Sequence, residues 1–442
     1  MSFDVKTVAL ADICSDVSYG YTASASTESV GPKFLRITDI QGGTVDWNNV
    51  PYCEISESKL SKNLLLKGDI VVARTGNSTG ENYMYSGNEP SVFASYLIRF
   101  KVDHNLANPH FVWLQMRTRR WWDFVSGAKS GSAQAGANAK VLGKFEVSLP
   151  SREIQDYIVN VVSNLSEKIH TNTQTNQTLE EIAQAIFKSW FVDFDPVKAK
   201  MNGEQPEGMD AATASLFPEK LVESELGLIP DGWRIQTIKA LSEKISKGTT
   251  PSKKDLASAT DEPSIRFIKV KDINDQGEIL RDKLETIPDS IHTSKLKRSI
   301  LEKEDILFSI AGTIGRVAIV DQDLDNVNTN QAVAFVRLKD KQTYLPLVYM
   351  AMRENRLQQK AISSIVQGVQ ANLSLANVGD MEVIVPSEDI LNLWNTQYSS
   401  MLQMIKSNFA QSRQLASLRD TLLPKLLSGE IELDIAEVNL ND

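Results

Sequence analysis

The feature that most constrains the fold of this chain is an internal repeat with a period of about 236 residues. The string FLRITDI at residues 34–40 returns as FIKVKDI at 267–273, and VSLP at 147–150 returns as VIVP at 383–386. Shorter matches at 68–70 and 131–134 return in the same order at 304–306 and 367–370. Chance matching of short apolar strings does not produce ordered matches at one offset, so the chain holds two copies of one large unit.

Each copy has the same internal order of predicted elements. Short apolar or alternating runs come first, as at residues 34–40, 69–73 and 95–102, and Gly, Asn and Ser separate them, which is typical of strands joined by turns. A helix candidate follows, at 109–124 or 344–360, and then a polar loop, a last strand and a long helical stretch. The pattern predicts an α+β fold with two tandem domains of mixed strands and helices, each followed by a long helix.

The repeat also places the boundaries between the predicted parts. Pro150 and Pro386 end the last strand of each copy at the same offset. The predicted parts are a first domain at 1–150, a first spacer helix at 151–190, a linker at 191–230, a second domain at 231–386, a second spacer helix at 387–430 and a tail at 431–442.

The two long helices have the spacing of a coiled-coil seam. Residues on one face recur at alternating steps of four and three, which is typical of a and d heptad positions. Arg419 interrupts the second seam, and its neighbour Leu418 is expected to take that place. The seam of the first helix is Ile158, Val162, Leu165, Ile169, Asn172, Asn176, Leu179, Ala183 and Ile186, and that of the second is Trp394, Tyr398, Met401, Ile405, Asn408, Ser412, Leu415, Arg419 and Leu422.

Both seams are polar at their centre, where Asn172 and Asn176 in one helix correspond to Asn408 and Ser412 in the other. In an antiparallel pair these layers face one another, and a buried amide there fixes the register at some cost in stability. The alternative is that the polar string at 171–178 breaks the first helix. A duplicated unit with paired helices has a pseudo-twofold axis, and helices of about 35 residues are roughly 50 Å long. Paired helices of this length hold two domains at a fixed separation, which suits two DNA sites that lie one turn, about 34–36 Å, or more apart.

The net charge of −9 does not argue against a nucleic-acid partner, because the charge is unevenly distributed. Residues 1–150 have 15 Lys and Arg against 14 Asp and Glu, and residues 231–386 have 22 against 21. The acidity therefore lies in the spacer and linker segments.

The cysteines and the hydropathy pattern indicate in which cellular compartment the protein is expected. Cys14 and Cys53 have no partner motif, and the four histidines are scattered, which excludes a cysteine-built zinc site and suits a reducing compartment. No apolar run of about 18 residues and no signal peptide is visible, so we expect a cytoplasmic protein with no membrane partner.

Four strings outside the repeat matches are specific enough to compare with known families. They are IFKSWFVDFDPVK at 186–198, LGLIPDGW at 226–233, GTTPS at 248–252 and LLPKLLSGEI at 422–431. Together with the repeat order they resemble the specificity subunits of type I restriction–modification systems, over the whole chain. The first half departs from the pattern because it lacks the Pro-x-Gly-Trp opening and has YGYT at 19–22 where the second half has KGTT at 247–250.

The resemblance implies a division of labour in which this chain is not the enzyme. Each domain would read one half of a gapped site in double-stranded DNA, and the helices would set the gap and dock the partners. Two methyltransferase subunits would bring S-adenosylmethionine and modify adenine, and two restriction–translocase subunits would bring ATP and magnesium. The chain itself would hold no cofactor and no metal.

Polar loops that recur in both halves are the candidates for DNA contact, because hydrogen-bonding side chains suit base edges and basic groups suit phosphates. The alternatives are solvated turns, amides that cap their own turn and ordinary surface lysines. The early loops contribute Tyr19, Tyr21, Lys247, Thr249, Ser252, Lys253 and Lys254. The glycine-containing loops contribute Arg74, Thr75, Asn77, Ser78, Ser309, Thr313 and Arg316. The amide-rich loops contribute Lys129, Ser130, Ser132, Gln134, Gln367, Gln370 and Asn372.

Two aromatic clusters remain open to more than one interpretation. The arginines at 117, 119 and 120 beside Trp121 and Trp122 are either a basic edge or a helix that buries its tryptophans and exposes its arginines. The string WFVDF at 190–194 is interpreted as a packing anchor or subunit contact rather than a cofactor site.

Two other classes of protein are weaker alternatives. A nuclease pattern can be placed on Asp46, Glu57 and Lys59, but it has no counterpart in the second half, and no phosphate-binding glycine loop or amino-methyltransferase string is visible. A coiled-coil adaptor that presents two domains to other ligands is compatible with the acidic balance.

Overall fold

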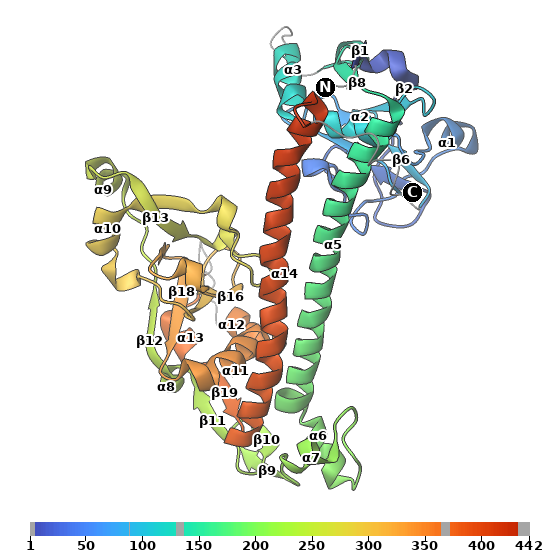
Figure 1. Ribbon diagram of the computed structural model, residues 1–442. Helices are drawn as coiled ribbons and strands as arrows, with labels where there is room; N and C mark the ends of the chain where they lie inside the picture. The colour runs from blue at the N-terminus through green and yellow to red at the C-terminus, as the bar shows by residue number, and fades with distance from the viewer. Residues whose placement is uncertain (1–4, 88, 130–136, 364–371, 432–442) are drawn as a thin grey trace. The chain divides into compact units, whose positions relative to one another are not determined.

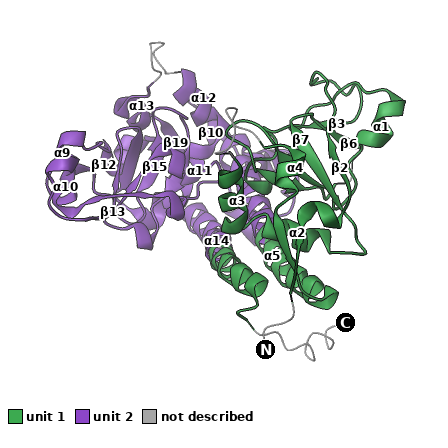
Figure 2. Cartoon of the chain, turned by 90° about the horizontal axis from the view of Figure 1, so that it is seen from above, with its two compact units in different colours: residues 1–171, 411–442 green, residues 172–410 purple. Residues whose placement is uncertain are grey.

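The computed structural model of the protein describes residues 5–87, 89–129, 137–363 and 372–431. The chain divides into two compact units, residues 1–171 with 411–442 and residues 172–410 (Figure 2). These units divide both long helices between them, whereas the boundaries predicted from the sequence follow the repeat. Those boundaries stay a prediction.

The first unit is built on an antiparallel four-stranded sheet in the order β2-β7-β4-β5. β4 is the continuous apolar run IVVA, buried at every position, as expected of an inner strand covered on both faces. The strands of the sheet are β2 (Cys14–Tyr19), β7 (Leu97–Val102), β4 (Ile70–Ala73) and β5 (Asn82–Met84). Two further pairs are β1 (Lys6–Ala9) antiparallel to β8 (Glu146–Leu149) and β3 (Lys33–Leu35) parallel to β6 (Ser91–Phe93).

Short helices complete the first unit, and its largest hydrophobic cluster lies between helices and sheet. Trp121 is fully buried in this cluster with Phe111 and Phe145. Trp121 also donates its indole N–H to the carbonyl oxygen of Gly80 at 2.8 Å, which satisfies the buried donor. The helices are α1 (Glu57–Asn63), α2 (Pro109–Gln115), α3 (Arg119–Lys129) and α4 (Ala139–Leu142).

The second unit repeats this topology. Its four-stranded sheet has the order β12-β18-β15-β16, and β12 has a register shift between Ser242 and Lys244 where β2 has one between Cys14 and Asp16. The strands are β12 (Ser242–Lys247), β18 (Val333–Leu338), β15 (Ile306–Ser309) and β16 (Val317–Ile319). The outer strands are β11 (Arg234–Thr237) with β19 (Glu382–Val385), and β13 (Pro263–Ile268) with β14 (Glu285–Pro288) and β17 (Asn328–Thr329). The helices are α8 (Ile238–Leu241), α9 (Lys253–Ser258), α10 (Asp289–Thr293), α11 (Lys341–Arg353), α12 (Asn355–Ser363) and α13 (Leu375–Gly379).

The two long helices are α5 (Arg152–Lys188) and α14 (Glu388–Ser428), and they pair antiparallel (Figure 1). In the second unit the amide of Asn176 donates to the Ile405 carbonyl oxygen at 3.2 Å and accepts from the Asn408 amide at 2.8 Å. In the first unit Leu426 is buried in the same cluster as Ile158. α5 continues through residues 171–178, so the alternative of a broken helix is wrong, and the expected facing of the asparagine layers is observed.

The seam residues are buried to different degrees, and one expectation about them is wrong. Leu418 is 46% exposed, so it does not replace Arg419, whose side chain is only 33% exposed. Helical periodicity keeps Arg419 on the packed face, where an arginine can bury its aliphatic stem. The buried seam residues are Ile158, Val162, Asn172, Asn176, Ala183, Trp394, Tyr398 and Ile405, and the half-buried ones are Leu165, Ile169, Leu179, Ile186, Met401, Asn408, Ser412, Leu415 and Leu422.

The segment that follows α5 packs within the second unit. Trp190 and Phe191 lie in a π-helical turn (Ser189–Asp193) and are 7% and 3% exposed. Phe191 packs against Trp233 with ring centroids 5.9 Å apart, and Trp190 against Phe217 at 5.2 Å. The string at 190–194 is therefore a packing anchor. The segment also contains α6 (Asp195–Met201), α7 (Ala211–Ser215), β9 (Leu221–Ser224) and β10 (Gly227–Pro230).

Candidate nucleic-acid interface

Three loops of the first unit meet at one end of its four-stranded sheet. The segment after β2 is held by hydrogen bonds from Gly20 N to the Leu97 carbonyl oxygen at 3.2 Å and from Tyr21 N to that of Phe93 at 2.7 Å. The β4–β5 loop begins at Arg74, whose N–H donates to the Tyr96 carbonyl oxygen at 3.1 Å. These backbone bonds bring the β2 end, the β4–β5 loop and the β6–β7 turn together.

We call this arrangement of three hydrogen-bonded segments the loop frame, and the second unit has the same one. Gly248 N donates to the Val333 carbonyl oxygen at 3.1 Å and Thr249 N to that of Thr329 at 3.1 Å, while Ile310 N donates to that of Ala332 at 2.8 Å. The loops at 19–22 and 247–250, which the sequence comparison aligned, are therefore structurally equivalent. Gly315 matches Gly80, and both have positive φ.

A glycine is required at the centre of each frame. A Cβ on Gly20 would lie 2.2 Å from the Phe93 carbonyl oxygen, and one on Gly248 would lie 2.0 Å from that of Thr329. Because the contacted atoms belong to the backbone, no side-chain rotation relieves the clash. The close approach of two chain segments is thus part of the repeated design.

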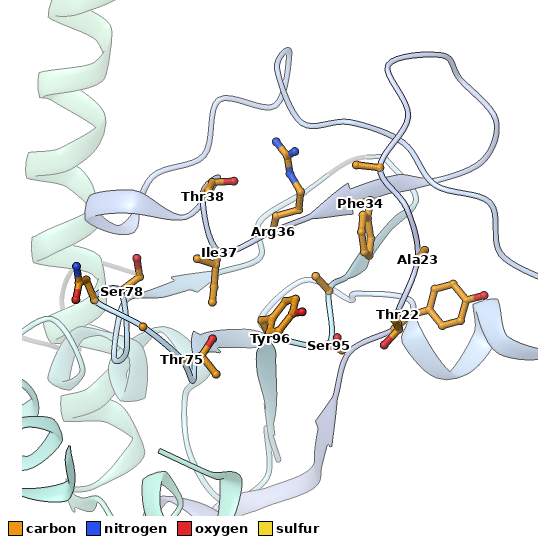
Figure 3. A pocket seen from close by; sticks show the side chains of 15 residues that line it. Thr22, Ala23, Phe34, Arg36, Ile37, Thr38, Thr75, Ser78, Ser95 and Tyr96 are labelled. Atoms are coloured by element: carbon orange, nitrogen blue, oxygen red, sulfur yellow. The ribbon is translucent and has the colours of Figure 1, made fainter. Parts of the chain in front are cut away.

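The frame of the first unit surrounds a hollow of about 620 Å³ (Figure 3). Four of the residues proposed from the sequence line it together, namely Tyr21, Thr75, Asn77 and Ser78. Sequence reasoning missed others that line it, namely Thr22, Arg36, Thr38, Ser95 and Tyr96. Tyr96 is 58% exposed, and its position inside a predicted strand concealed it. The adjacent hydroxyl-bearing residues Ser95 and Tyr96, just before the run LIRF at 97–100, are the sequence signal that could have revealed it.

Arg74 and Tyr19 lie beside this hollow and contact each other. The guanidinium carbon of Arg74 is 5.0 Å from the centre of the Tyr19 ring, and Arg74 Nε donates to the Ser95 carbonyl oxygen at 3.1 Å. The Tyr19 hydroxyl accepts from Ala139 N at 3.1 Å. These bonds hold a cation and an aromatic ring at the rim of the hollow.

In the second unit the equivalent positions hold different side chains. Lys247 and Thr249 are exposed at the end of β12, and Thr313 is exposed in the β15–β16 turn. Asn372 is exposed and forms an isolated bridge with Ala311 next to this turn. A lysine and a threonine therefore stand where the first unit has Tyr19 and Tyr21.

Two other residues of the second set are engaged inside the protein. Ser309 is fully buried, and its hydroxyl donates to the Thr313 carbonyl oxygen at 2.6 Å and accepts from Arg316 N at 2.8 Å. Arg316 pairs with Asp275 at 3.0 Å and lines a smaller hollow of about 260 Å³. The structure thus gives Ser309 a role in shaping the turn, because its hydroxyl has no exposed surface.

The remaining predicted residues lie elsewhere or outside the described part of the chain. Ser252 caps α9 by accepting from Asp255 N at 3.1 Å, Lys253 and Lys254 are exposed in the first turn of that helix, and α9 lies beside α10 (Figure 1). Lys129 ends α3, and only its backbone is described. Ser130, Ser132, Gln134, Gln367 and Gln370 lie outside the described residues.

The structure decides between the two interpretations of the arginines and tryptophans near the start of α3. Trp121 is fully buried, whereas Arg119 is 93% exposed and Arg120 49% exposed at their side chains. This is the arrangement of a helix that buries its tryptophan and exposes its arginines.

The described ranges offer neither a metal-binding cluster nor a membrane-spanning helix. Those residues contain no group of three or more His, Cys, Asp or Glu that could hold a metal ion. Burial, together with the nearby Asp16 carboxylate, raises the pKa of the Cys14 thiol to about 12, which disfavours the thiolate that metals bind. No described helix is both long and apolar enough to span a membrane.

The chain thus contains two copies of one α+β domain, which present different side chains on the same loop frame. This architecture is that of a duplicated recognition protein. The family profile described as "Type I restriction modification DNA specificity domain" matches residues 4–181 and 230–406. The chain belongs to this family of type I restriction–modification specificity subunits. This confirms the resemblance seen in the sequence, the fold class, and the expectation of a non-catalytic subunit.

Individual relatives agree with this assignment. The HindI specificity subunit of Haemophilus influenzae is 27% identical over 479 residues, covering 97% of this chain and 100% of that protein. The MjaIX specificity subunit of Methanocaldococcus jannaschii is 23% identical over 328 residues, covering 73% and 69%. The crystal structure of the type I S subunit from M. genitalium has the same fold, with a TM-score of 0.55 over 96% of both chains at 13% identity.

Proposed function

We propose that each repeated loop frame reads one half of a gapped site in double-stranded DNA and that α5 and α14 set the gap. The observation that supports this proposal is the identical backbone frame around Gly20 and Gly248, on which the exposed side chains differ. A constant frame with variable side chains is what two recognition domains for different half-sites require. Family membership supports DNA sequence specificity, and the division into half-sites is our inference.

The chemistry of the two frames suits different base patterns. The first presents an amide, hydroxyls and aromatic rings on Asn77, Thr75, Ser78, Tyr21 and Tyr96. Amide side chains pair well with adenine, and hydroxyls contact several bases. Arg74 supplies charge for the phosphate backbone, whereas Arg36 is paired with Asp39 at 2.8 Å. We infer that the residues around the first hollow read one half-site.

The second frame offers a different set of side chains. Lys247, Thr249, Thr313 and Asn372 are exposed around it. Lysine can pair with guanine or bind phosphate, and the amide of Asn372 suits adenine. Since the two sets share few side chains, the two half-sites are expected to differ in sequence.

The helices are long enough for a spacer. α14 has 41 residues, and a helix of that length extends roughly 60 Å. Two half-sites on one face of DNA are about 34–36 Å apart or a multiple of this distance. The register bonds of Asn176 support a fixed separation rather than a sliding one.

The partner and cofactor assignments are part of the same proposal. We propose that the chain acts in the cytoplasm and docks two methyltransferase subunits, which bind S-adenosylmethionine, and two restriction–translocase subunits, which bind ATP and magnesium. Membership of a specificity-subunit family supports DNA, methyltransferase and restriction subunits as partners, and the two-to-one ratios are what the family resemblance implies. The chain itself is proposed to bind none of these cofactors.

The test is a genome-wide map of methylated adenines in cells with and without this gene, with the methyltransferase partner present. We expect a gapped two-part motif that disappears with the gene. Exchanging residues 1–150 for the corresponding domain of a relative should then change one half of the motif and leave the other half and the gap unchanged. A change in both halves would contradict the two-reader proposal.

Point variants make this test sharper. Asn77→Ala is expected to relax the preference at one position of the first half-site, by about 1–3 kcal/mol of discrimination. Asn202→Ala, at an exposed helix end outside both frames, is the matched control and should leave the motif unchanged.

A further inference from the structure

A second hollow of the first unit, of about 480 Å³, lies away from the loop frame. One side is basic and consists of Arg117, Arg119 and Arg120 at the start of α3. The other side is apolar and consists of Leu423, Pro424 and Leu427 near the end of α14. We refer to these six residues as the arginine–leucine groove.

The positive charge in this groove is only partly balanced. Arg117 donates to the Gly42 carbonyl oxygen at 2.6 Å, but its Nη1 is buried without a hydrogen-bond partner. Arg119 has its nearest carboxylate, Asp123, at 3.7 Å, and both side chains are largely exposed. The carboxylate of Glu81 acts on the side chain of Arg117, and Asp420 also lines the hollow. The positive charge available to an additional anionic ligand is therefore that of Arg119 and Arg120, whose side chains are 93% and 49% exposed.

The second unit shows how the equivalent arginine is satisfied. Arg353 occupies the position of Arg117 in the repeat, and it pairs with the nearly buried carboxylate of Glu180 at 2.8 Å. The repeat offset places Ala416 where a counterpart of Glu180 would stand. The first unit therefore has no carboxylate at this position of α14, and the carboxylate that acts on Arg117 is that of Glu81 instead.

The apolar side of the groove is also less covered than the equivalent surface of the second unit. Phe187 and Phe191, which correspond to Leu423 and Leu427, are 4% and 3% exposed. Phe191 is covered by Trp233, at 5.9 Å between ring centroids, from the segment that follows α5. In the first unit Leu423 and Leu427 remain partly exposed. A covering segment is thus present on one copy of this surface and missing from the described part of the other.

The sequence after α14 has the composition of such a cover. At the repeat offset, residues 432–442 correspond to residues 196–206, which begin with α6. They contain four carboxylates and no lysine or arginine, interleaved with apolar side chains. The carboxylates are Glu432, Asp434, Glu437 and Asp442, and the apolar residues between them include Leu433, Ile435, Val438 and Leu440. Ile431, directly before them, already packs against the core of the first unit.

We propose that residues 432–442 bind in the arginine–leucine groove of their own chain, with their carboxylates on the arginines and their apolar side chains on Leu423 and Leu427. Two observations support this occupant: the charge complementary to the exposed Arg119 and Arg120, and the position of Ile431 at the core of the same unit. The bound segment would cover Leu423 and Leu427, as Trp233 covers Phe191 in the second unit. It would also withhold the two exposed arginines, Arg119 and Arg120, from DNA phosphates.

The proposal can be tested on the full chain with a photo-crosslinking amino acid, p-benzoylphenylalanine, in place of Leu427. We expect mass spectrometry to locate an intrachain crosslink in residues 432–442. Reversing the two exposed arginines, with Arg119→Glu and Arg120→Glu, should lower the crosslink yield at least tenfold without disturbing the buried Arg117. Adding Glu432→Lys, Asp434→Lys and Glu437→Lys to that variant should restore it.

Controls separate this result from alternatives. Lys62→Glu, on the exposed surface of α1 in the same unit, should leave the yield unchanged. A yield that does not respond to the arginine reversal would overturn the proposal. Crosslinks that form to added DNA or to a partner subunit, and that persist when residues 432–442 are deleted, would also overturn it and assign the groove to that other ligand.

Discussion

Gly20 and Gly248 show how one atom decides a local structure. Each lies where the end of a strand crosses the backbone of a neighbouring segment, and a methyl group would overlap a carbonyl oxygen at about 2 Å in both cases. Relief requires a backbone shift, because no side chain can move away. The loops that depend on this approach include the residues proposed to read DNA.

We therefore expect Gly20→Ala and Gly248→Ala each to destabilise the protein by about 1–3 kcal/mol through overpacking. Each should also weaken recognition of its own half-site only. Urea unfolding and the methylation motif measure the two effects. Gly127→Ala is the control: Gly127 lies inside α3 with open space at its Cβ, so alanine should be neutral or stabilise by up to about 1 kcal/mol. Equal losses for all three variants would contradict the close-approach argument.

Ser309 provides a second test at this scale. Its hydroxyl bridges Thr313 and Arg316 inside the β15–β16 turn. Ser309→Ala leaves one carbonyl and one N–H without that partner, and we expect a loss of about 1–3 kcal/mol in the free energy of unfolding. The bases recognised should stay the same, because Ser309 is fully buried. A changed motif with unchanged stability would return Ser309 to the set of reading residues.

At the scale of elements, α5 and α14 combine apolar seams with a polar centre. Asn176 is 5% exposed and makes two hydrogen bonds across the pair, to Ile405 and from Asn408. Such buried amides sacrifice some apolar burial, and they penalise any register in which they lose their partners. This is a physical reason for a helix pair with a single register.

Replacing one partner should be worse than replacing both. Asn176→Leu leaves the Asn408 amide without its acceptor, and we expect a loss of about 1–3 kcal/mol. Asn408→Leu added to it should recover part of that loss, which a double-mutant cycle by denaturant unfolding would measure. Asn164→Leu, on the exposed face of α5, is the control and should change stability by no more than about 0.5 kcal/mol. Additive losses would show that the two amides do not act as a pair.

At the scale of the whole molecule, the proposed gap depends on helix length. Inserting one heptad in α5 beside Asn172 and one at the facing position of α14 preserves the seam. Seven residues add about 10 Å, which corresponds to about three base pairs at 3.4 Å each. We expect the gap to widen by up to this amount while both half-sites stay the same, as read from mapped methylation. A heptad in α5 alone should disrupt the register and abolish the motif, and an unchanged gap in the double insertion would remove the spacer role.

Much of this architecture could be predicted from the sequence because it is written in short-range patterns. The strings that recur in the repeat, the apolar runs that became β4 and β7, and the heptad spacing of α5 and α14 are each properties of residues near one another in the chain. Periodicity specifies which face of an element is apolar, and the fold class and the helix pairing could be predicted from those faces. Tyr21, Thr75 and Asn77 were found because polar residues beside glycines recur in both halves.

The tertiary structure decided what depends on distant segments. It buried Ser309, kept Arg419 rather than Leu418 on the packed face, and brought Tyr96 and Arg36 to the hollow beside Thr75. Burial of a side chain depends on which strands pair and which helices cover them, and residue type alone does not specify this. The sequence by itself determined that two equivalent domains and two paired helices would form. Long-range backbone hydrogen bonds and packing decided which side chains each frame presents to a ligand.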